Sequence, residues 1–98
     1  MFSVLTYDIE ISENGNKRLR KVSKICQNYG VRVQNSVFEL NINCEQLIKL
    51  KNDLQQIIDE DVDSIRIYNF GNTKRNNTIE VLGKKEKIEI SIESSIIL

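Results

Sequence analysis

Aliphatic residues recur at intervals of three and four positions between Asn43 and Asp59, and this spacing constrains the fold more than any other feature of the chain. On a helix with about 3.6 residues per turn, such residues lie along one side. The segment is therefore predicted to be an amphipathic helix that covers a hydrophobic core. A capping box is predicted at its start, because Gln46 stands three positions after Asn43. The apolar stripe consists of Leu47, Leu50, Leu54, Ile57 and Ile58.

A second amphipathic helix is predicted from a turn at residues 13–16 to about residue 28. An asparagine in that turn would cap the helix, and Gly30 would end it. The cations gather on the side opposite the apolar stripe, except Arg18, which points into the apolar sector. Since Arg18 lies near the helix start, it could instead turn toward the loop after Asp8. The apolar stripe consists of Leu19, Val22, Ile25, Cys26 and Tyr29.

Strands are predicted around both helices. The first is apolar on both faces, as expected of a central strand. The second and third are short and separated at Gln34 and Asn35, which indicates a hairpin or a bulge. The order strand, helix, strand, strand, helix, strand predicts an α+β, ferredoxin-like fold: an antiparallel sheet with both helices on one face and a short extra C-terminal strand. The strand segments are 2–8, 31–33, 36–40, 64–70 and 79–82.

Length and composition bound the class of protein. The 98 residues suffice for one modest core, so residues 1–98 are predicted to form one domain. No apolar run approaches the roughly 18 residues that a membrane-spanning helix requires. The first residues have neither the cationic lead-in nor the cleavage pattern of a signal peptide. We therefore expect a soluble, cytoplasmic protein without a membrane partner.

Two apolar surfaces would lack a cover in a monomer. The central strand is apolar on both faces, whereas the two helices cover only one of them. The chain also ends in Ile96, Ile97 and Leu98. Twofold pairing of two sheets would shield both surfaces. We expect a homodimer in which the C-terminal extension, residues 79–98, crosses to the partner.

The chain contains no histidine, which limits its chemistry. Imidazole general bases, serine or cysteine triads and His-ligated metal centres are excluded. Cys26 and Cys44 do not have the spacing of a zinc site and are expected to be reduced, partly buried thiols. Hydrolysis would have to depend on carboxylates, a metal-bound water or tyrosine.

The charge is unevenly distributed. The chain has 14 basic and 14 acidic residues, yet six of the basic ones and none of the acidic ones lie between Asn14 and Phe38. Such a run is usually a solvated face, but no acid within the run can pair with these cations at i,i+4, which favours a track for a nucleic-acid backbone. The six cations are Lys17, Arg18, Arg20, Lys21, Lys24 and Arg32.

Several blocks resemble the CRISPR-associated Cas-two family: residues 4–8 (VLTYD), 16–22 (NKRLRKV), 29–39 (YGVRVQNSVFE) and 63–68 (DSIRIY). The resemblance implies a ferredoxin-like homodimer that sits between dimers of the CRISPR integrase. It also implies that Mg²⁺, or another divalent cation such as Mn²⁺, is held near the dimer axis by the aspartate of the Tyr-Asp pair. That residue is Asp8, which would be both the metal ligand and the catalytic residue.

The nucleic-acid-handling positions implied by the resemblance are Tyr7, Arg18, Arg20, Arg32 and Phe38, to which the charge pattern adds Lys17, Lys21 and Lys24. Asp8 and the two aromatic residues also have ordinary structural explanations. A lone aspartate at a strand end often accepts hydrogen bonds from the following turn. Buried aromatic rings in small domains are usually core, which we favour for Phe38 and leave open for Tyr7.

Two functions remain open at this stage. The first is a subunit for CRISPR spacer acquisition that binds duplex DNA and bridges integrase dimers, with a Mg²⁺-dependent endonuclease site for RNA or DNA at Asp8. The second is a stand-alone, toxin-like endoribonuclease. Whether the chain is an enzyme is therefore not decided by its sequence.

Overall fold

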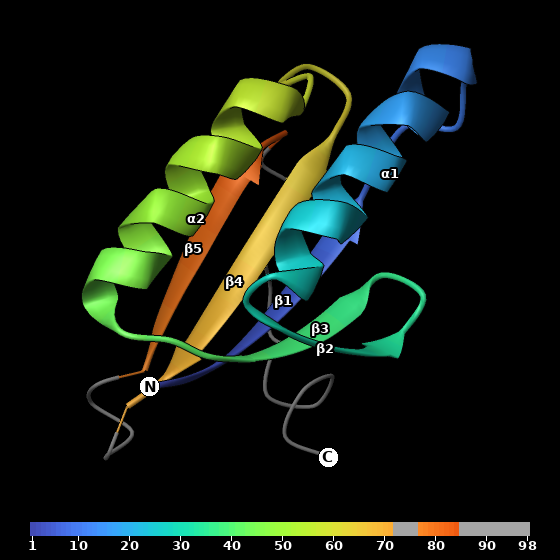
Figure 1. Cartoon of the computed structure of the whole chain (residues 1–98). Coiled ribbons are helices and arrows are strands. Elements are labelled where there is room, and N and C mark those ends of the chain that lie inside the picture. Colours follow the sequence, from blue (N-terminus) through green and yellow to red (C-terminus); the bar gives the residue numbers. More distant parts are fainter. Residues whose placement is uncertain (72–76, 85–98) are drawn as a thin grey trace.

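The computed structural model describes residues 1–71 and 77–84, which contain two helices and five strands (Figure 1). Their order is the predicted one, and the fifth strand is present. The predicted crossing of residues 79–98 to a partner depends on residues 85–98, which lie outside the described residues. The elements are β1 (Phe2–Asp8), α1 (Glu13–Gln27), β2 (Gly30–Gln34), β3 (Val37–Asn41), α2 (Cys44–Ile57), β4 (Ser64–Phe70) and β5 (Thr78–Gly83).

The strands form one sheet in the order β2-β3-β1-β4-β5, and every neighbouring pair is antiparallel. The first four strands in this order are those of a ferredoxin-like fold, with β5 added at the edge next to β4. The predicted α+β fold class is therefore confirmed. A register shift between Arg32 and Gln34 places a bulge in the β2–β3 hairpin, as the sequence suggested.

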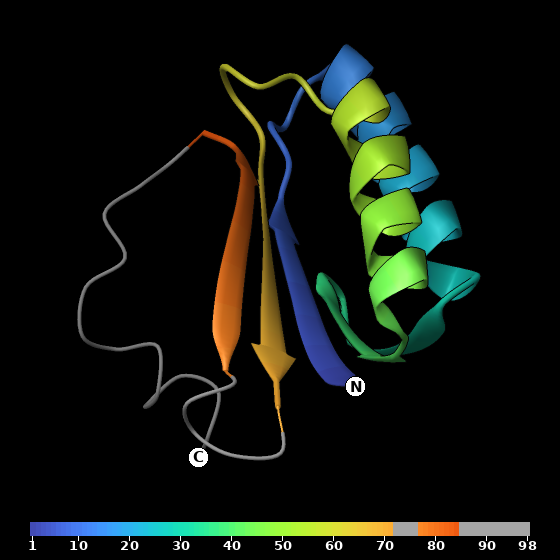
Figure 2. The same ribbon diagram turned by 90° about the vertical axis from the view of Figure 1, so that its left-hand side faces the viewer.

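Both helices pack on the same face of the sheet (Figure 2). Because side chains alternate along a strand, Leu5 and Tyr7 of β1 face the helices and are buried. Val4 points to the other face, where it lies in a row across the sheet with Tyr68 and Ile79. We call this side the open face, since no helix of residues 1–71 or 77–84 covers it.

The open face carries apolar side chains that remain accessible to solvent. The exposed fractions are 46% for Phe2, 67% for Val31 and 43% for Ile79. Phe2 also lies against Phe70, with ring centroids 5.7 Å apart. An apolar surface of this kind usually marks a contact with another molecule.

The ends of α1 differ from the prediction. The N-cap is Ser12, whose hydroxyl accepts a hydrogen bond from the Gly15 N–H at 2.9 Å, so the predicted asparagine cap is wrong. The helix ends at Gln27 with Asn28 as its C-cap, and Gly30 begins β2 instead of ending the helix. The capping box of α2, formed by Asn43 and Gln46, is confirmed.

The two cysteines lie in different surroundings. Cys26 is buried in the core, and this burial raises the pKa of its thiol to about 12. Cys44, the first residue of α2, is exposed, so the expectation of a partly buried thiol is wrong there. Over the described residues, no helix is long and apolar enough to span a bilayer.

Candidate nucleic-acid and metal site

Asp8 is the last residue of β1 and is exposed. It pairs with Ser64 of β4 and lies on the same side of the strand as Thr6, that is, on the open face. Tyr7 points to the opposite side, toward the helices. The Tyr-Asp pair therefore does not form one site, because strand alternation separates the two side chains.

Asp63 holds the loop that follows Asp8. Its carboxylate is fully buried and accepts hydrogen bonds from the backbone N–H of Glu10 at 2.9 Å and of Asp59 at 2.9 Å. Arg18 donates from Nε to Oδ2 at 2.7 Å and from a terminal nitrogen to Oδ1 at 3.3 Å. One carboxylate thus connects α1 with the loops before α1 and before β4.

The Asp63 carboxyl is ionised despite its burial. Burial alone would raise its pKa, but the Arg18 guanidinium and the N–H groups of Glu10 and Asp59 together hold the pKa below its usual value. The hydrogen bond to Asp63 in turn raises the pKa of Arg18. The two groups therefore form a charged pair near neutral pH.

Arg18 differs from the other cations of α1. The sequence treated it as a cation without a nearby acid, but the structure pairs it with Asp63 and brings it 3.9 Å from Glu10. The option that Arg18 turns toward the loop after Asp8 is thus confirmed, and the assumption that it is unpaired is wrong. The sequence missed Asp63 because it stands among other acids. The one sequence signal that pointed to a buried acid was Arg18, an arginine in the apolar sector of a helix, which requires an acidic partner.

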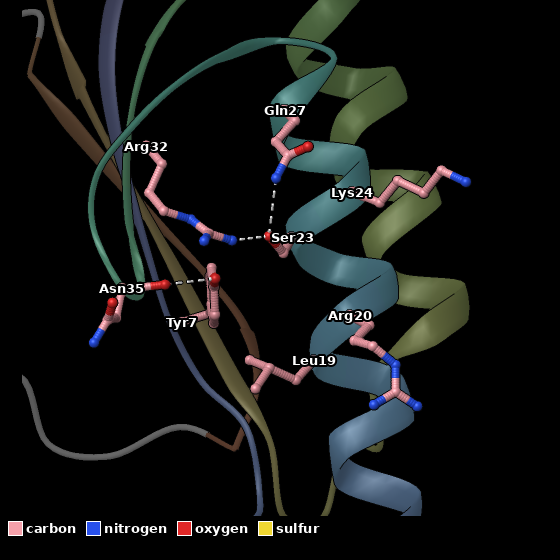
Figure 3. A pocket seen from close by; sticks show the side chains of 8 residues that line it. All are labelled: Tyr7, Leu19, Arg20, Ser23, Lys24, Gln27, Arg32 and Asn35. Atoms are coloured by element: carbon pink, nitrogen blue, oxygen red, sulfur yellow. Dashed lines mark hydrogen bonds between the residues drawn. The ribbon is translucent and has the colours of Figure 1, made fainter.

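A groove of about 480 Å³ lies between α1 and the β2–β3 hairpin (Figure 3). We call it the α1 groove. It brings together three of the predicted cations, Arg20, Lys24 and Arg32, with the predicted residue Tyr7. Figure 3 shows Arg32 reaching toward α1, while the side chains of Arg20 and Lys24 extend away from the groove.

Arg32 is exposed and lines the groove from β2. Its guanidinium donates a hydrogen bond to the Ser23 hydroxyl and stands 5.5 Å from the centre of the Phe38 ring. Phe38 itself is fully buried and lies against Tyr7, so it is a core residue without a surface for stacking on a base. Tyr7 is also buried, and its hydroxyl donates to the Asn35 carbonyl at 2.9 Å.

Lys17 and Lys21 are exposed on α1 and do not line the groove. Arg20 and Lys24 are exposed on the same helix. Within the described part of the chain, none of these four cations forms an ion pair. Together they make a positive helix surface, and Glu13, the one acid of α1, forms no ion pair with them.

The fit of a divalent cation can be judged from the donors around Asp8. Among residues 1–71 and 77–84, no three carboxylate or thiol side chains cluster as a ligand set. The nearby Glu10 carboxylate is already 3.4 Å from the Ser12 hydroxyl and 3.9 Å from Arg18. Asp8 fits Mg²⁺ as a single ligand of the kind that is completed by waters, phosphates or a second carboxylate.

The comparisons with known proteins decide the family. The family model described as "CRISPR associated protein Cas2" matches residues 1–78. The chain belongs to the Cas2 family. This is the family that the sequence blocks resembled, so that prediction is confirmed.

Relatives in the Cas2 family match nearly the whole chain. The chain is 50% identical to the "CRISPR-associated endonuclease Cas2" of Halalkalibacterium halodurans, over 92% of this chain and 94% of that protein. It is 39% identical to the "CRISPR-associated endoribonuclease Cas2" of Chlorobaculum tepidum, over the full length of both. The crystal structure of Streptococcus pyogenes Cas2 superposes with a TM-score of 0.69 at 46% identity, over 76% of this chain and 92% of that one.

Proposed function

We propose that this Cas2 family chain is a homodimeric subunit for CRISPR spacer acquisition, in which it binds duplex DNA and bridges dimers of the integrase. The observation that carries the proposal is the row of exposed cations on α1 without ion-pair partners among the described residues. Such cations bind phosphates with little dependence on sequence. A twofold axis would add a second row of cations from the partner copy.

The open face supports the dimer. One row of side chains on this face crosses all five strands, and Glu39 is its one charged member. Two such faces packed together would remove the exposed Val31 and Ile79 from water. The row is Val31, Glu39, Val4, Tyr68 and Ile79. Asp8 lies on this same face at the end of β1. A twofold axis close to that end would bring the Asp8 carboxylates of both copies together.

Phosphodiester cleavage at Asp8 is part of the proposal. Two facing Asp8 carboxylates and the substrate phosphates offer the oxygen ligands that Mg²⁺ prefers. A divalent cation bound there would supply a Lewis acid that neutralises charge developing at phosphorus. Asp8 would contribute a negatively charged oxygen ligand to the cation. Asp63 fixes the loop that follows Asp8 through its hydrogen bond from the Glu10 N–H. The chain has no histidine to act as a base.

Binding of duplex DNA can be tested through its salt dependence. Affinity should fall steeply as salt rises, because each bound phosphate releases counterions. The double variant Lys17→Gln/Lys21→Gln removes four cations from the proposed dimer and should reduce the slope of log K against log salt by up to about 4. Lys49→Gln, which removes an exposed cation from α2, should leave the slope unchanged. An affinity that does not respond to salt would refute phosphate contact.

The role of Asp8 needs two measurements on Asp8→Ala. Nuclease turnover with Mg²⁺ should be lost if Asp8 holds the cation, whereas spacer acquisition with the cognate integrase should persist if the chain acts mainly as a scaffold. A variant that cleaves as fast as the wild type would remove Asp8 from the site.

The second candidate is a stand-alone endoribonuclease, favoured by the name of the Chlorobaculum tepidum relative. Growth arrest on expression of this chain alone, abolished by Asp8→Ala, would favour that function.

A further inference from the structure

The α1 groove lies on the helix side of the sheet, whereas Asp8 lies on the open face. Tyr7 and Asp8 are consecutive, so strand alternation directs the Tyr7 ring to the groove and the Asp8 carboxylate away from it. A phosphate in the groove is therefore a different phosphate from one at Asp8. The groove also differs from the exposed track, because Lys17 and Lys21 do not line it.

The chemistry of the groove suits a phosphate group. Arg32 is fixed by Ser23 and by its position over Phe38, and only one of its five N–H donors is used by Ser23. A guanidinium held in this way can form two parallel hydrogen bonds to a phosphate. The side chains of Arg20 and Lys24 extend away from the groove in Figure 3, but both are exposed, and exposed side chains of this length reorient within nanoseconds. No acid is among the described residues that line the groove.

The size and the apolar part of the groove suit more than a phosphate. About 480 Å³ lies in the range of small-molecule sites and exceeds the needs of an inorganic anion. Leu19, which is 39% exposed, is the main apolar residue that lines the groove, and Tyr7, which is 6% exposed, lies beneath it. A base or sugar has Leu19 to contact while its phosphate reaches Arg32.

We propose that the α1 groove binds a nucleoside phosphate, with the phosphate at Arg32 and Ser23 and the nucleoside against Leu19 and Tyr7. Its source is the phosphorylated end of a nucleic-acid strand, and this assignment of the source rests on the proposed function. The groove thus recognises a strand end, while the exposed track binds the duplex.

The test is a titration of the full-length ¹⁵N-labelled protein, monitored by NMR. Adenosine monophosphate should shift the amide signals of Leu19, Ser23 and Arg32 with saturation. Inorganic phosphate should shift Ser23 and Arg32 but bind more weakly, and adenosine should bind more weakly than either. Equal shifts along the outer side of α1, without saturation at the groove, would overturn the proposal.

Variants make the test specific. Arg32→Gln should weaken the binding of adenosine monophosphate by about tenfold or more, since it removes a charge-assisted contact. Arg32→Lys should restore part of the affinity, because it keeps the charge and loses the planar fork. Lys49→Gln removes one charge outside the groove and should change the affinity by less than about twofold. Equal losses for Arg32→Gln and Lys49→Gln would contradict the proposal. Urea unfolding of each variant checks that it is folded.

A second set of ligands separates the source from the function. A short single strand with a 5′-phosphate should bind better than the same strand with a 5′-hydroxyl and compete with adenosine monophosphate. If adenosine monophosphate binds but the 5′-phosphate does not raise the affinity of the strand, the groove takes free nucleotides and the strand-end assignment is wrong. Binding of a blunt duplex without nucleotide binding would refute the groove site alone. Nucleotide binding without any duplex binding would refute the proposed function alone.

Discussion

Asp63 shows how one residue can determine both charge and loop geometry. Asp63→Asn keeps the size of the side chain but removes the charge that Arg18 requires. We expect a loss of about 1.5–3 kcal/mol in the free energy of unfolding at pH 7, the usual value of hydrogen bonds to a charged group. Urea unfolding measures this difference directly. In the control, Asp61→Asn changes an exposed acid of the same loop and should cost less than about 0.5 kcal/mol.

The same pair predicts a pH dependence. The pKa of Asp63 is lower in the folded chain than in the unfolded chain, so its stabilisation is fully present above the unfolded value of about 3.9. It is lost as the pH falls below that value and through the folded pKa. The stability gap between wild type and Asp63→Asn should therefore close in acid. A gap that stays constant down to the lowest pH of folding would show that Asp63 acts only through its shape.

At the residue scale, the sequence could predict which side chains carry charge but not which of them meet. Arg20, Lys24 and Arg32 were predicted from the run of cations and the family resemblance, and the structure places them along one groove. Asp63 could not be selected, because its role depends on the loops before α1 and before β4 meeting in space. The separation of Tyr7 from Asp8 follows from strand alternation, which the sequence already contained.

At the scale of elements, the start of α1 depends on Gly15. A Cβ at this position would lie 1.8 Å from the Glu10 carbonyl oxygen. Alanine favours a helix interior over glycine by about 1 kcal/mol, but overpacking typically costs about 1–3 kcal/mol. Here the neighbour is backbone and cannot rotate away. Gly15→Ala should therefore destabilise the fold, as measured by thermal or urea unfolding, and Glu10 would shift away from Asp63.

The matched control in the same helical turn is Asn14→Ala, which changes an exposed residue. It should alter the unfolding free energy by no more than about 0.5 kcal/mol. A Gly15→Ala protein as stable as Asn14→Ala would mean that the loop after Asp8 adjusts without cost. In that case the position of Asp8 would not depend on the packing of α1.

The elements themselves were predictable because periodicity is a local property. Strand 64–70 and the capping box of α2 appear where the sequence placed them. The N-cap of α1 could not be predicted in this way. Ser12, Asn14 and Asn16 are all good capping residues, and only the path of the backbone selects one of them. The close approach of Gly15 to Glu10 is likewise a tertiary feature.

At the scale of the whole molecule, the open face argues for a twofold dimer. We expect sedimentation equilibrium at micromolar concentration to give twice the mass of one chain, because Phe2, Val31 and Ile79 would otherwise stay in water. Ile79→Asp places a charge on that face and should shift the equilibrium to the monomer, because burying an unpaired carboxylate is costly.

Ile48→Asp is the matched control, since Ile48 is exposed on α2, on the other side of the sheet. It should leave the dimer intact. A wild-type monomer at micromolar concentration, or dissociation by both variants alike, would contradict the open face as the interface and would leave each Asp8 without a second carboxylate.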